Sequence, residues 1–257
     1  MERASLMNKK AICFKTIETH TLGEPTRIVI EGFPKYTAKS MMEYKEYLEN
    51  NYDQYRSALM CEPRGHKDMV GALLVEPISK EADIGVIYMD ANRWINMCGH
   101  ATIGVSMTLV NEKLAKVVEP VTHLTLETPA GLIHVDVEVE DGKAKSVSFE
   151  NIPSFLYEEN CLVNNIHFDI SYSGSFFALI DADQLDMEIN INNANKFKEL
   201  GVNLLKQINE KYDVKHPTLP INRVVNVEFY HKTNDGQKNI VISEEGMIDR
   251  SPCGTGT

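Results

Sequence analysis

The pattern of apolar and polar positions along the chain predicts a mixture of strands and helices. Apolar residues recur at helical spacing in 40–60 and 193–212, which predicts two surface helices. Residues 101–111 are apolar on most sides, which is typical of a buried helix. Short apolar runs bounded by glycine, proline and aspartate predict strands. These strands are expected at 11–17, 26–32, 72–75, 83–89, 123–127, 132–139, 146–150, 166–172, 175–180, 224–229 and 239–242.

The order of these elements predicts an α+β fold of two similar lobes. Each half of the chain shows strands, a surface helix, further strands and then a cysteine followed by glycine. We place the boundary near residues 151–153, so that residues 1–150 form the first lobe and 151–257 the second. A chain of 257 residues is long enough for two medium-sized domains.

Charge and hydropathy exclude several classes of partner. The net charge of −11 at pH 7 argues against nucleic acid or an anionic membrane surface. No apolar run reaches the length of a transmembrane helix, and residues 1–10 lack the hydrophobic core of a secretory signal. A small anionic substrate stays open, because backbone dipoles can bind one on an acidic protein.

The cysteines indicate a reducing environment. Their number is odd, and their spacing matches no CxxC or metal-ligand pattern. We therefore expect a cytoplasmic protein with free thiols and without a metal. The five cysteines are Cys13, Cys61, Cys98, Cys161 and Cys253.

Two of the cysteines stand in similar settings, NMCGH at 96–100 and DRSPCGTGT at 249–257. Cys98 is expected at the N-terminus of the buried helix, where the helix dipole lowers the pKa of a thiol. The glycine after each cysteine leaves backbone N–H groups open to a carboxylate. Two thiols that face one substrate could remove a proton from one side of a carbon acid and return one to the other. The pair thus indicates inversion of a stereocentre without a cofactor.

Other interpretations of the same residues stay open. A lone Cys-Gly is most often a small buried apolar residue, and a disulfide between Cys98 and Cys253 is disfavoured by the cytoplasmic prediction. His100 beside Cys98 suggests a hydrolase, but residues two apart on a helix do not face each other well. We therefore expect His100 to bond the substrate. Asp249 is expected either to accept a hydrogen bond from a substrate ammonium or to cap a turn.

The two cysteine motifs resemble the paired signatures of the proline racemase family. Segments 20–29 (HTLGEPTRIV), 62–69 (EPRGHKDM), 118–123 and 173–177 also match it. From their residues alone, the first two of these segments are more simply loops than parts of a cleft. The resemblance implies two lobes of mixed sheet wrapped around a central helix, similar to diaminopimelate epimerase. It also implies a racemase or epimerase that needs no cofactor and acts on a free amino acid, proline or hydroxyproline.

The resemblance assigns roles to particular residues. Cys98 and Cys253 become the acid and base thiols, and His100 and Asp249 take the ring nitrogen. Family members that dehydrate 3-hydroxyproline carry threonine in place of the second cysteine, so Cys253 indicates an epimerase. The substrate contacts are expected from Gly99, His100, Asp249, Gly254 and Thr255.

Two departures from the family pattern concern the substrate. Proline racemases tend to enclose the proline ring with two phenylalanines, and the matching positions here are Val70 and Ser243. The smaller side chains open the pocket, and the serine hydroxyl can bond a substrate hydroxyl. We therefore expect 4-hydroxyproline to be accepted, and hypothesise that it is preferred over proline.

The last departure is length, because the family continues beyond the second cysteine motif and this sequence stops at Thr257. We expect an incomplete second lobe, and a weak anion cradle at Cys253 if no helix follows it. An inactive or non-catalytic amino-acid-binding fragment is therefore one alternative function, and a Cys-dependent hydrolase is a second. The sequence leaves the oligomeric state open, and a homodimer is one of the states considered.

Overall fold

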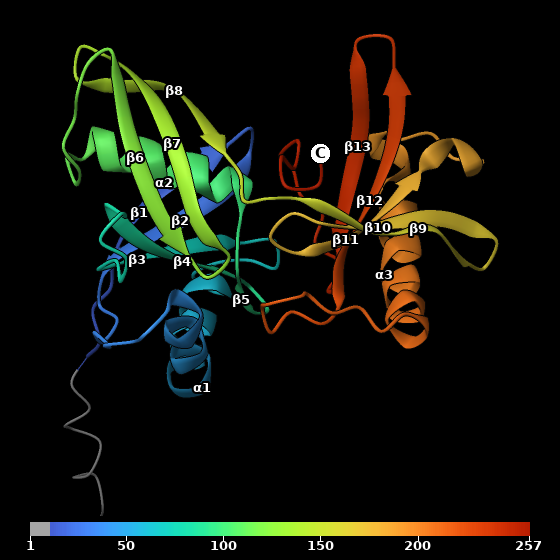
Figure 1. Cartoon of the computed structure of the whole chain (residues 1–257), viewed down its shortest axis with the longest axis horizontal. Coiled ribbons are helices and arrows are strands. Elements are labelled where there is room, and N and C mark those ends of the chain that lie inside the picture. Colours follow the sequence, from blue (N-terminus) through green and yellow to red (C-terminus); the bar gives the residue numbers. More distant parts are fainter. Residues whose placement is uncertain (1–10) are drawn as a thin grey trace, which may run out of the picture.

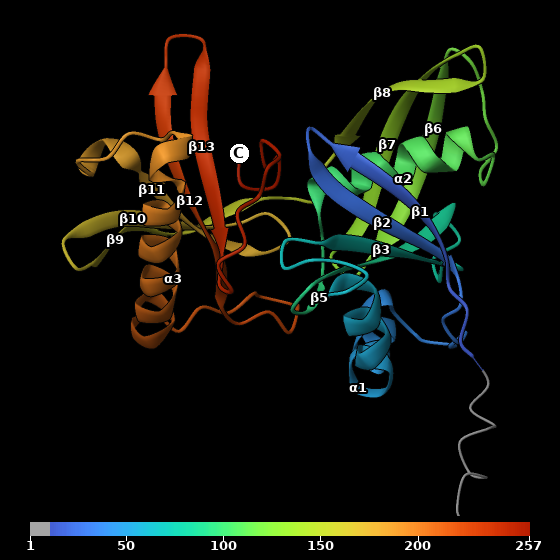
Figure 2. The same cartoon turned by 180° about the vertical axis from the view of Figure 1, so that it is seen from behind.

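Two β-sheets, one from each half of the chain, form the framework of the protein and lie side by side (Figure 1). The computed structural model describes residues 11–257, so the expectation about a signal in residues 1–10 lies outside the described part. The chain passes from the first sheet to the second between Glu150 and Phe155. Seen from behind, the C-terminal segment lies between the sheets (Figure 2).

The first sheet curls around a helix. It follows the order β1-β2-β3-β4-β6-β7-β8, with the short β5 paired to β4. Helix α2 (Gly99–Asn111) packs against strands from both ends of this order, β1 and β2 at one and β7 and β8 at the other. The strands are β1 (Lys15–Thr21), β2 (Glu24–Glu31), β3 (Val70–Val75), β4 (Ile84–Asp90), β5 (Trp94–Ile95), β6 (Val121–Thr128), β7 (Gly131–Glu140) and β8 (Lys143–Glu150).

The middle of this sheet is buried on both faces. Ile28 and Ala72 contact the core around α2, whereas their neighbours Val29 and Leu73 contact the core under helix α1 (Met41–Met60). Successive side chains of a strand point to opposite faces, so α1 and α2 cover opposite sides. The strands there are accordingly continuous apolar runs rather than alternating ones.

Helix α2 is the central helix that the sequence predicted. Ala101, Val105, Leu109 and Val110 are fully buried in it. It starts two residues earlier than expected, at Gly99, and Cys98 is its N-cap residue with an extended backbone. The first cysteine therefore stands where the unpaired N–H groups of the helix begin.

The second sheet has the order β13-β12-β11-β10-β9. Strands β11 and β12 are parallel, and helix α3 (Ala194–Lys211) in the connection between them packs on β12 and β13. The strands are β9 (Phe155–Val163), β10 (Ile166–Tyr172), β11 (Phe176–Asp181), β12 (Val224–Thr233) and β13 (Gly236–Ser243), and two short 3-10 helices are η1 (Ala182–Gln184) and η2 (Ile191–Asn193).

The predicted fold class, α+β with two lobes of mixed sheet and a central helix, is confirmed. One strand prediction needs correction, and two strands were missed. Strand β1 begins at Lys15 rather than at residue 11. Strand β9 was not predicted, because it is an edge strand whose middle residues are polar and exposed, so it lacks regular alternation. The two-residue β5 is too short to leave a pattern. Within residues 11–257, no helix has the length and apolarity to cross a membrane.

Helix α2 should carry much of the stability of the first lobe. Leu109 is 0% exposed and packs inside the curled sheet. We expect Leu109→Ala to lower the free energy of unfolding by about 2–5 kcal/mol, because it removes buried methyl groups and leaves a cavity. Leu114, 45% exposed just beyond the helix, is the matched control, and Leu114→Ala should cost less than about 0.5 kcal/mol. Urea unfolding of both variants measures the difference, and equal losses would contradict the assignment.

Candidate functional site

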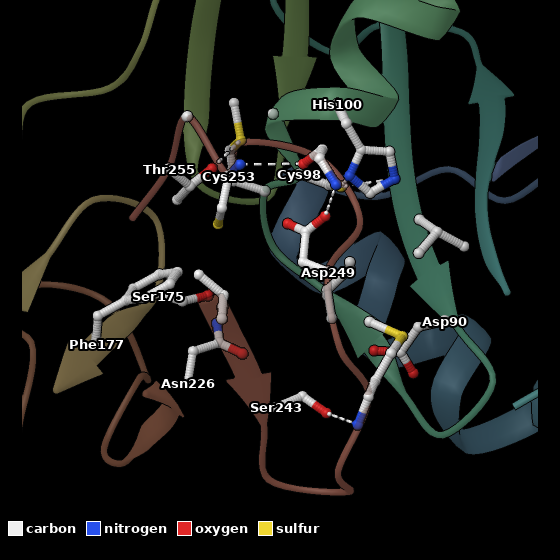
Figure 3. A pocket seen from close by; sticks show the side chains of 18 of the residues that line it. Asp90, Cys98, His100, Ser175, Phe177, Asn226, Ser243, Asp249, Cys253 and Thr255 are labelled. Carbon is white, nitrogen blue, oxygen red and sulfur yellow. Dashed lines mark hydrogen bonds between the residues drawn. The ribbon is translucent and has the colours of Figure 1, made fainter. Parts of the chain in front are cut away.

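A pocket lies between the two lobes, where α2 begins and the C-terminal segment folds over it (Figure 3). It brings together residues that are far apart in the sequence. Every residue to which the sequence assigned a role in the site lines this pocket, namely Val70, Cys98, Gly99, His100, Ser243, Asp249, Cys253, Gly254 and Thr255.

The two cysteine motifs contact each other directly. A Cβ atom placed on Gly99 would lie 3.3 Å from Oγ1 and 3.7 Å from the backbone nitrogen of Thr255. Ser173, on the second lobe, donates a hydrogen bond to the carbonyl of Thr255. Cys98 is half-buried and Cys253 is buried, and neither forms a disulfide. The two thiols therefore line one pocket, and each comes from a different lobe.

The expectation that Cys98 and His100 do not face each other is wrong. Sγ of Cys98 lies 3.3 Å from Nδ1 of His100, within hydrogen-bond distance. The reason is the backbone of Cys98, which is extended at the N-cap (φ −146°) rather than helical, so the geometry of two residues inside a helix does not apply. His100 is itself buried, and burial lowers the pKa of its imidazole, so the neutral ring is favoured.

The expected lowering of the Cys98 pKa is also wrong. Burial raises the pKa of this thiol well above its usual value, and the negative charge of Asp249 adds to the effect. A hydrogen bond from the N–H of Ala101 acts in the opposite direction but is smaller. The pKa of Cys253 is raised for the same two reasons, burial first and Asp249 second. In this pocket desolvation outweighs the start of the helix.

A chain of hydrogen bonds shapes the second cysteine motif. The N–H of Ser251 donates to Oδ1 of Asp249 at 2.8 Å, and the N–H of Cys253 donates to Oγ of Ser251 at 3.1 Å. The carbonyl of Cys253 accepts the N–H groups of Gly256 and Thr257, both at 3.0 Å. Asp249 thus caps this turn, one of its two expected roles, and also lines the pocket.

Strands β12 and β13 support the same motif from the second lobe. Glu228 is buried, and its Oε1 accepts a hydrogen bond from Nδ2 of Asn239 at 3.0 Å. Nδ2 of Asn239 also donates to the carbonyl of Pro252 at 2.9 Å. A Cβ atom on Gly256 would lie 2.0 Å from Oε2 of Glu228, so a larger residue there would displace the Glu228 carboxyl. Burial raises the pKa of the Glu228 carboxyl to about 7.

The end of the pocket away from the cysteines combines apolar and polar side chains. Val70 and Ser243 are buried there, and Asp90 lies at the same end in Figure 3. Oγ of Ser243 accepts the N–H of Met247 at 3.1 Å, so its own proton remains able to donate. Burial raises the pKa of Asp90.

Several pocket residues were not found from the sequence. Phe177 belongs to the 173–177 segment, which matched the family pattern without a stated role. Asp90, Arg93 and Asn226 carry no local signal, because their strands or turns reach the pocket only through the sheet topology. Residues 11–257 contain no group of three or more histidine, cysteine, aspartate or glutamate side chains placed to hold a metal ion.

Comparison with known proteins agrees with the motif resemblance. The family model described as Proline racemase matches residues 16–257. The chain is 48% identical to a proline racemase from Clostridioides difficile, over 95% of this chain and 75% of that protein. It is 36% identical to a 4-hydroxyproline 2-epimerase from Cereibacter sphaeroides, over 95% of this chain and 75% of that protein.

A solved structure has the same fold. It is a hydroxyproline epimerase from Agrobacterium vitis with bound trans-4-OH-L-proline, 31% identical, with a TM-score of 0.90 over 95% of this chain and 74% of that one. The resemblance inferred from the motifs is therefore confirmed. The chain belongs to the proline racemase family and is an isomerase of its amino-acid racemase and epimerase class.

Proposed function

We propose that the protein inverts the Cα configuration of free proline or 4-hydroxyproline through two thiols, Cys98 and Cys253, and without a cofactor. The observation that carries this proposal is the presence of two free cysteines, one from each lobe, in the wall of one pocket. A thiolate on one side removes the Cα proton, and the thiol on the other side delivers a proton to the opposite face. The net change is inversion, with no electron transferred.

The low-polarity pocket suits this proton transfer. The Cα–H bond of an amino acid is a very weak acid, so a base of raised pKa is more effective once it is ionised. Two negative charges close together in a buried site disfavour each other. The state with one thiolate and one thiol is therefore favoured over the dianion, and that state is the one in which base and acid are both ready.

Backbone N–H groups are the proposed binding site for the substrate carboxylate. Gly99 and His100 begin helix α2, whose first N–H groups have no partner within the helix. Gly254 and Thr255 lie on the facing motif, which contacts Gly99. His100 and Asp249, both in the pocket, are the proposed partners of the ring nitrogen.

The far end of the pocket supports a hydroxylated substrate. Val70 leaves more room than an aromatic side chain, and the Ser243 hydroxyl can still donate a proton. A structural relative holds trans-4-OH-L-proline. When proline is bound, the buried Ser243 hydroxyl has no ligand hydroxyl to which it can donate, and this lowers the affinity for proline. We therefore propose that 4-hydroxyproline is preferred over proline.

The alternatives have weaker support. The contact between Cys98 and His100 would also suit a hydrolase, but such an enzyme needs one essential thiol and the relatives are named as racemases and epimerases. A non-catalytic amino-acid-binding role would leave the pairing of two thiols without a use. The experiments below separate all three.

Removing either thiol should abolish inversion. We expect Cys98→Ser and Cys253→Ser each to lower kcat by about a thousandfold, because each removes an acid or base group. Cys13→Ser is the control, since Cys13 is exposed and outside the pocket. Polarimetry with L- and D-substrates and entry of deuterium at Cα measure the effect. One essential thiol instead of two would favour the hydrolase, and binding without deuterium exchange would favour the non-catalytic role.

The substrate preference should depend on Ser243. We expect kcat/KM for 4-hydroxyproline to exceed that for proline, and Ser243→Ala to lower the ratio by about tenfold, because one hydrogen bond to the ligand is lost. The control is Ser251→Ala, which alters another pocket serine whose hydroxyl accepts the N–H of Cys253; it should slow both substrates equally. A clear preference of the unmodified protein for proline would refute this proposal.

The raised thiol pKa should be visible in alkylation. Because burial raises the pKa of Cys98 and Cys253, little thiolate exists at pH 7. We expect iodoacetamide to modify Cys98 slowly at pH 7, with a rate that rises about tenfold per pH unit toward alkaline pH. Peptide mass spectrometry follows each site, with exposed Cys13 as the internal reference. A Cys98 rate that is already constant above pH 7 would show an acidic thiol instead.

A further inference from the structure

The turn between β1 and β2, residues 21–24, contacts both cysteine motifs. Oγ1 of Thr21 donates a hydrogen bond to the carbonyl of His100 at 3.0 Å. The N–H of Arg250 donates to Oε2 of Glu24 at 2.8 Å, and the Arg250 guanidinium lies 3.4 Å from the carbonyl of Gly23. From the sequence this segment was more simply a loop. In the structure it joins the first motif, on its own lobe, to the second motif, on the other lobe.

The backbone of the turn explains how it reaches both motifs. Leu22 (φ 52°) and Gly23 (φ 97°) are both left-handed, which is the conformation of a tight two-residue hairpin turn. Thr21 and Glu24 are therefore paired across the hairpin. The Leu22 side chain is 72% exposed, and the hydrogen bonds to the motifs come from Thr21, Gly23 and Glu24.

Glu24 is an unusual residue at this place because it carries an ionisable carboxyl and is 0% exposed. Its Oε2 accepts the Arg250 N–H, while Oε1 has no hydrogen-bond partner among the residues that the structure describes. The charged groups around it are Asp249, Arg250 and Asp68, and burial raises the pKa of the Glu24 carboxyl to about 7. Burying a carboxyl costs free energy. A role in holding the second motif would explain why a glutamate stands at this buried position.

Hydrogen bonds and the backbone between them link Glu24 to the backbone of Cys253. Glu24 accepts a hydrogen bond from the N–H of Arg250. Asp249, the residue before Arg250, accepts one from the N–H of Ser251. The Ser251 hydroxyl in turn holds the N–H of Cys253. Each bond in this path orients a backbone group of the next residue. A shift of Arg250 would therefore be passed on to the cysteine.

The ion pairs across the cleft are looser. The guanidinium of Arg93 lies 3.7 Å from Glu244 and 3.9 Å from Glu245, and that of Arg250 lies 4.0 Å from Asp68. Partly exposed ion pairs at such distances orient their partners weakly. The hydrogen bond of buried Glu24 is shorter, at 2.8 Å, and its donor is a backbone N–H.

We propose that Glu24 is a positioning residue, which holds the loop of Asp249 and Cys253 against the start of α2 and so aligns the second thiol with the substrate. This inference rests on the proposed function, since it gives Cys253 a part in the chemistry. The first thiol and the N–H groups of α2 do not depend on this bond. Loss of Glu24 should therefore impair proton transfer on one face of the substrate most, and should weaken binding to a lesser degree, because Asp249, Gly254 and Thr255 lie on the displaced loop.

Glu24→Ala tests the role directly, because it leaves the Arg250 N–H without a partner. We expect kcat for inversion to fall about tenfold to a hundredfold, with KM raised by a smaller factor because part of the substrate contact comes from the same loop. Deuterium should still enter the enantiomer whose Cα–H bond faces Cys98. Exchange without inversion should therefore appear for one enantiomer and not for the other. Glu31→Gln, an exposed change at the other end of β2, is the control and should behave like the unmodified protein.

Glu24→Gln keeps an acceptor oxygen but removes the charge. It should restore most of kcat, because the amide oxygen can accept the same N–H. Ionised Glu24 raises the pKa of Cys98, so removing this charge lowers that pKa. The rising limb of kcat/KM against pH should therefore move to lower pH, a change that a purely structural role would not produce.

The outcomes separate this inference from the proposed function. If Cys253→Ser is inactive while Glu24→Ala inverts at the unmodified rate, Glu24 has no positioning role and the two-thiol proposal stands. Equal loss of exchange from both enantiomers, with a lowered Tm, would mean that Glu24 only stabilises the fold. If Glu24→Ala does not fold, the pH dependence of Glu24→Gln decides. The inference is overturned if the rising part of its kcat/KM against pH does not move to lower pH. If Cys253→Ser stays active, the proposed function itself fails.

Discussion

The close contact between Gly99 and Thr255 is the constraint on which the site depends. It brings the start of α2 on one lobe against the second cysteine motif on the other, with no room for a side chain to stand between them without displacing Thr255. Both thiols reach one pocket because of this contact. The curled first sheet positions α2, and the second sheet with Glu228 supports the facing motif. The fold thus serves mainly to hold two short segments together.

Burial gives this contact its chemical character. Two thiols and the carboxyls of Glu24, Asp90 and Glu228 lie at or near the cleft, and burial raises the pKa of each. Such an environment makes every added negative charge costly. The buried site therefore favours states in which few of these groups are ionised at once. The same environment makes hydrogen bonds within the site stronger than they would be in water.

The helices and most strands were predictable because their signals are local. Helix α1 ends at Met60 as expected, and the Ser40 side chain accepts the N–H of Glu43 at its start. Strand β9 was missed because an exposed edge strand has no apolar face to show. In the site, the paired motifs were visible in the sequence. Asp90 and Asn226 were not, because nothing around them distinguishes a pocket residue from any other polar residue in or beside a strand.

The sequence by itself determined the positions of α1, α2 and α3, the two cysteine motifs and, through them, the family. Only the tertiary structure decided how the site residues behave. It turned Cys98 toward His100, raised the pKa of a thiol that the helix start alone would lower, and buried Glu24 in a hairpin turn between the motifs. The physical reason is that desolvation and hydrogen bonding across the cleft depend on residues distant in the chain, so no local pattern records them.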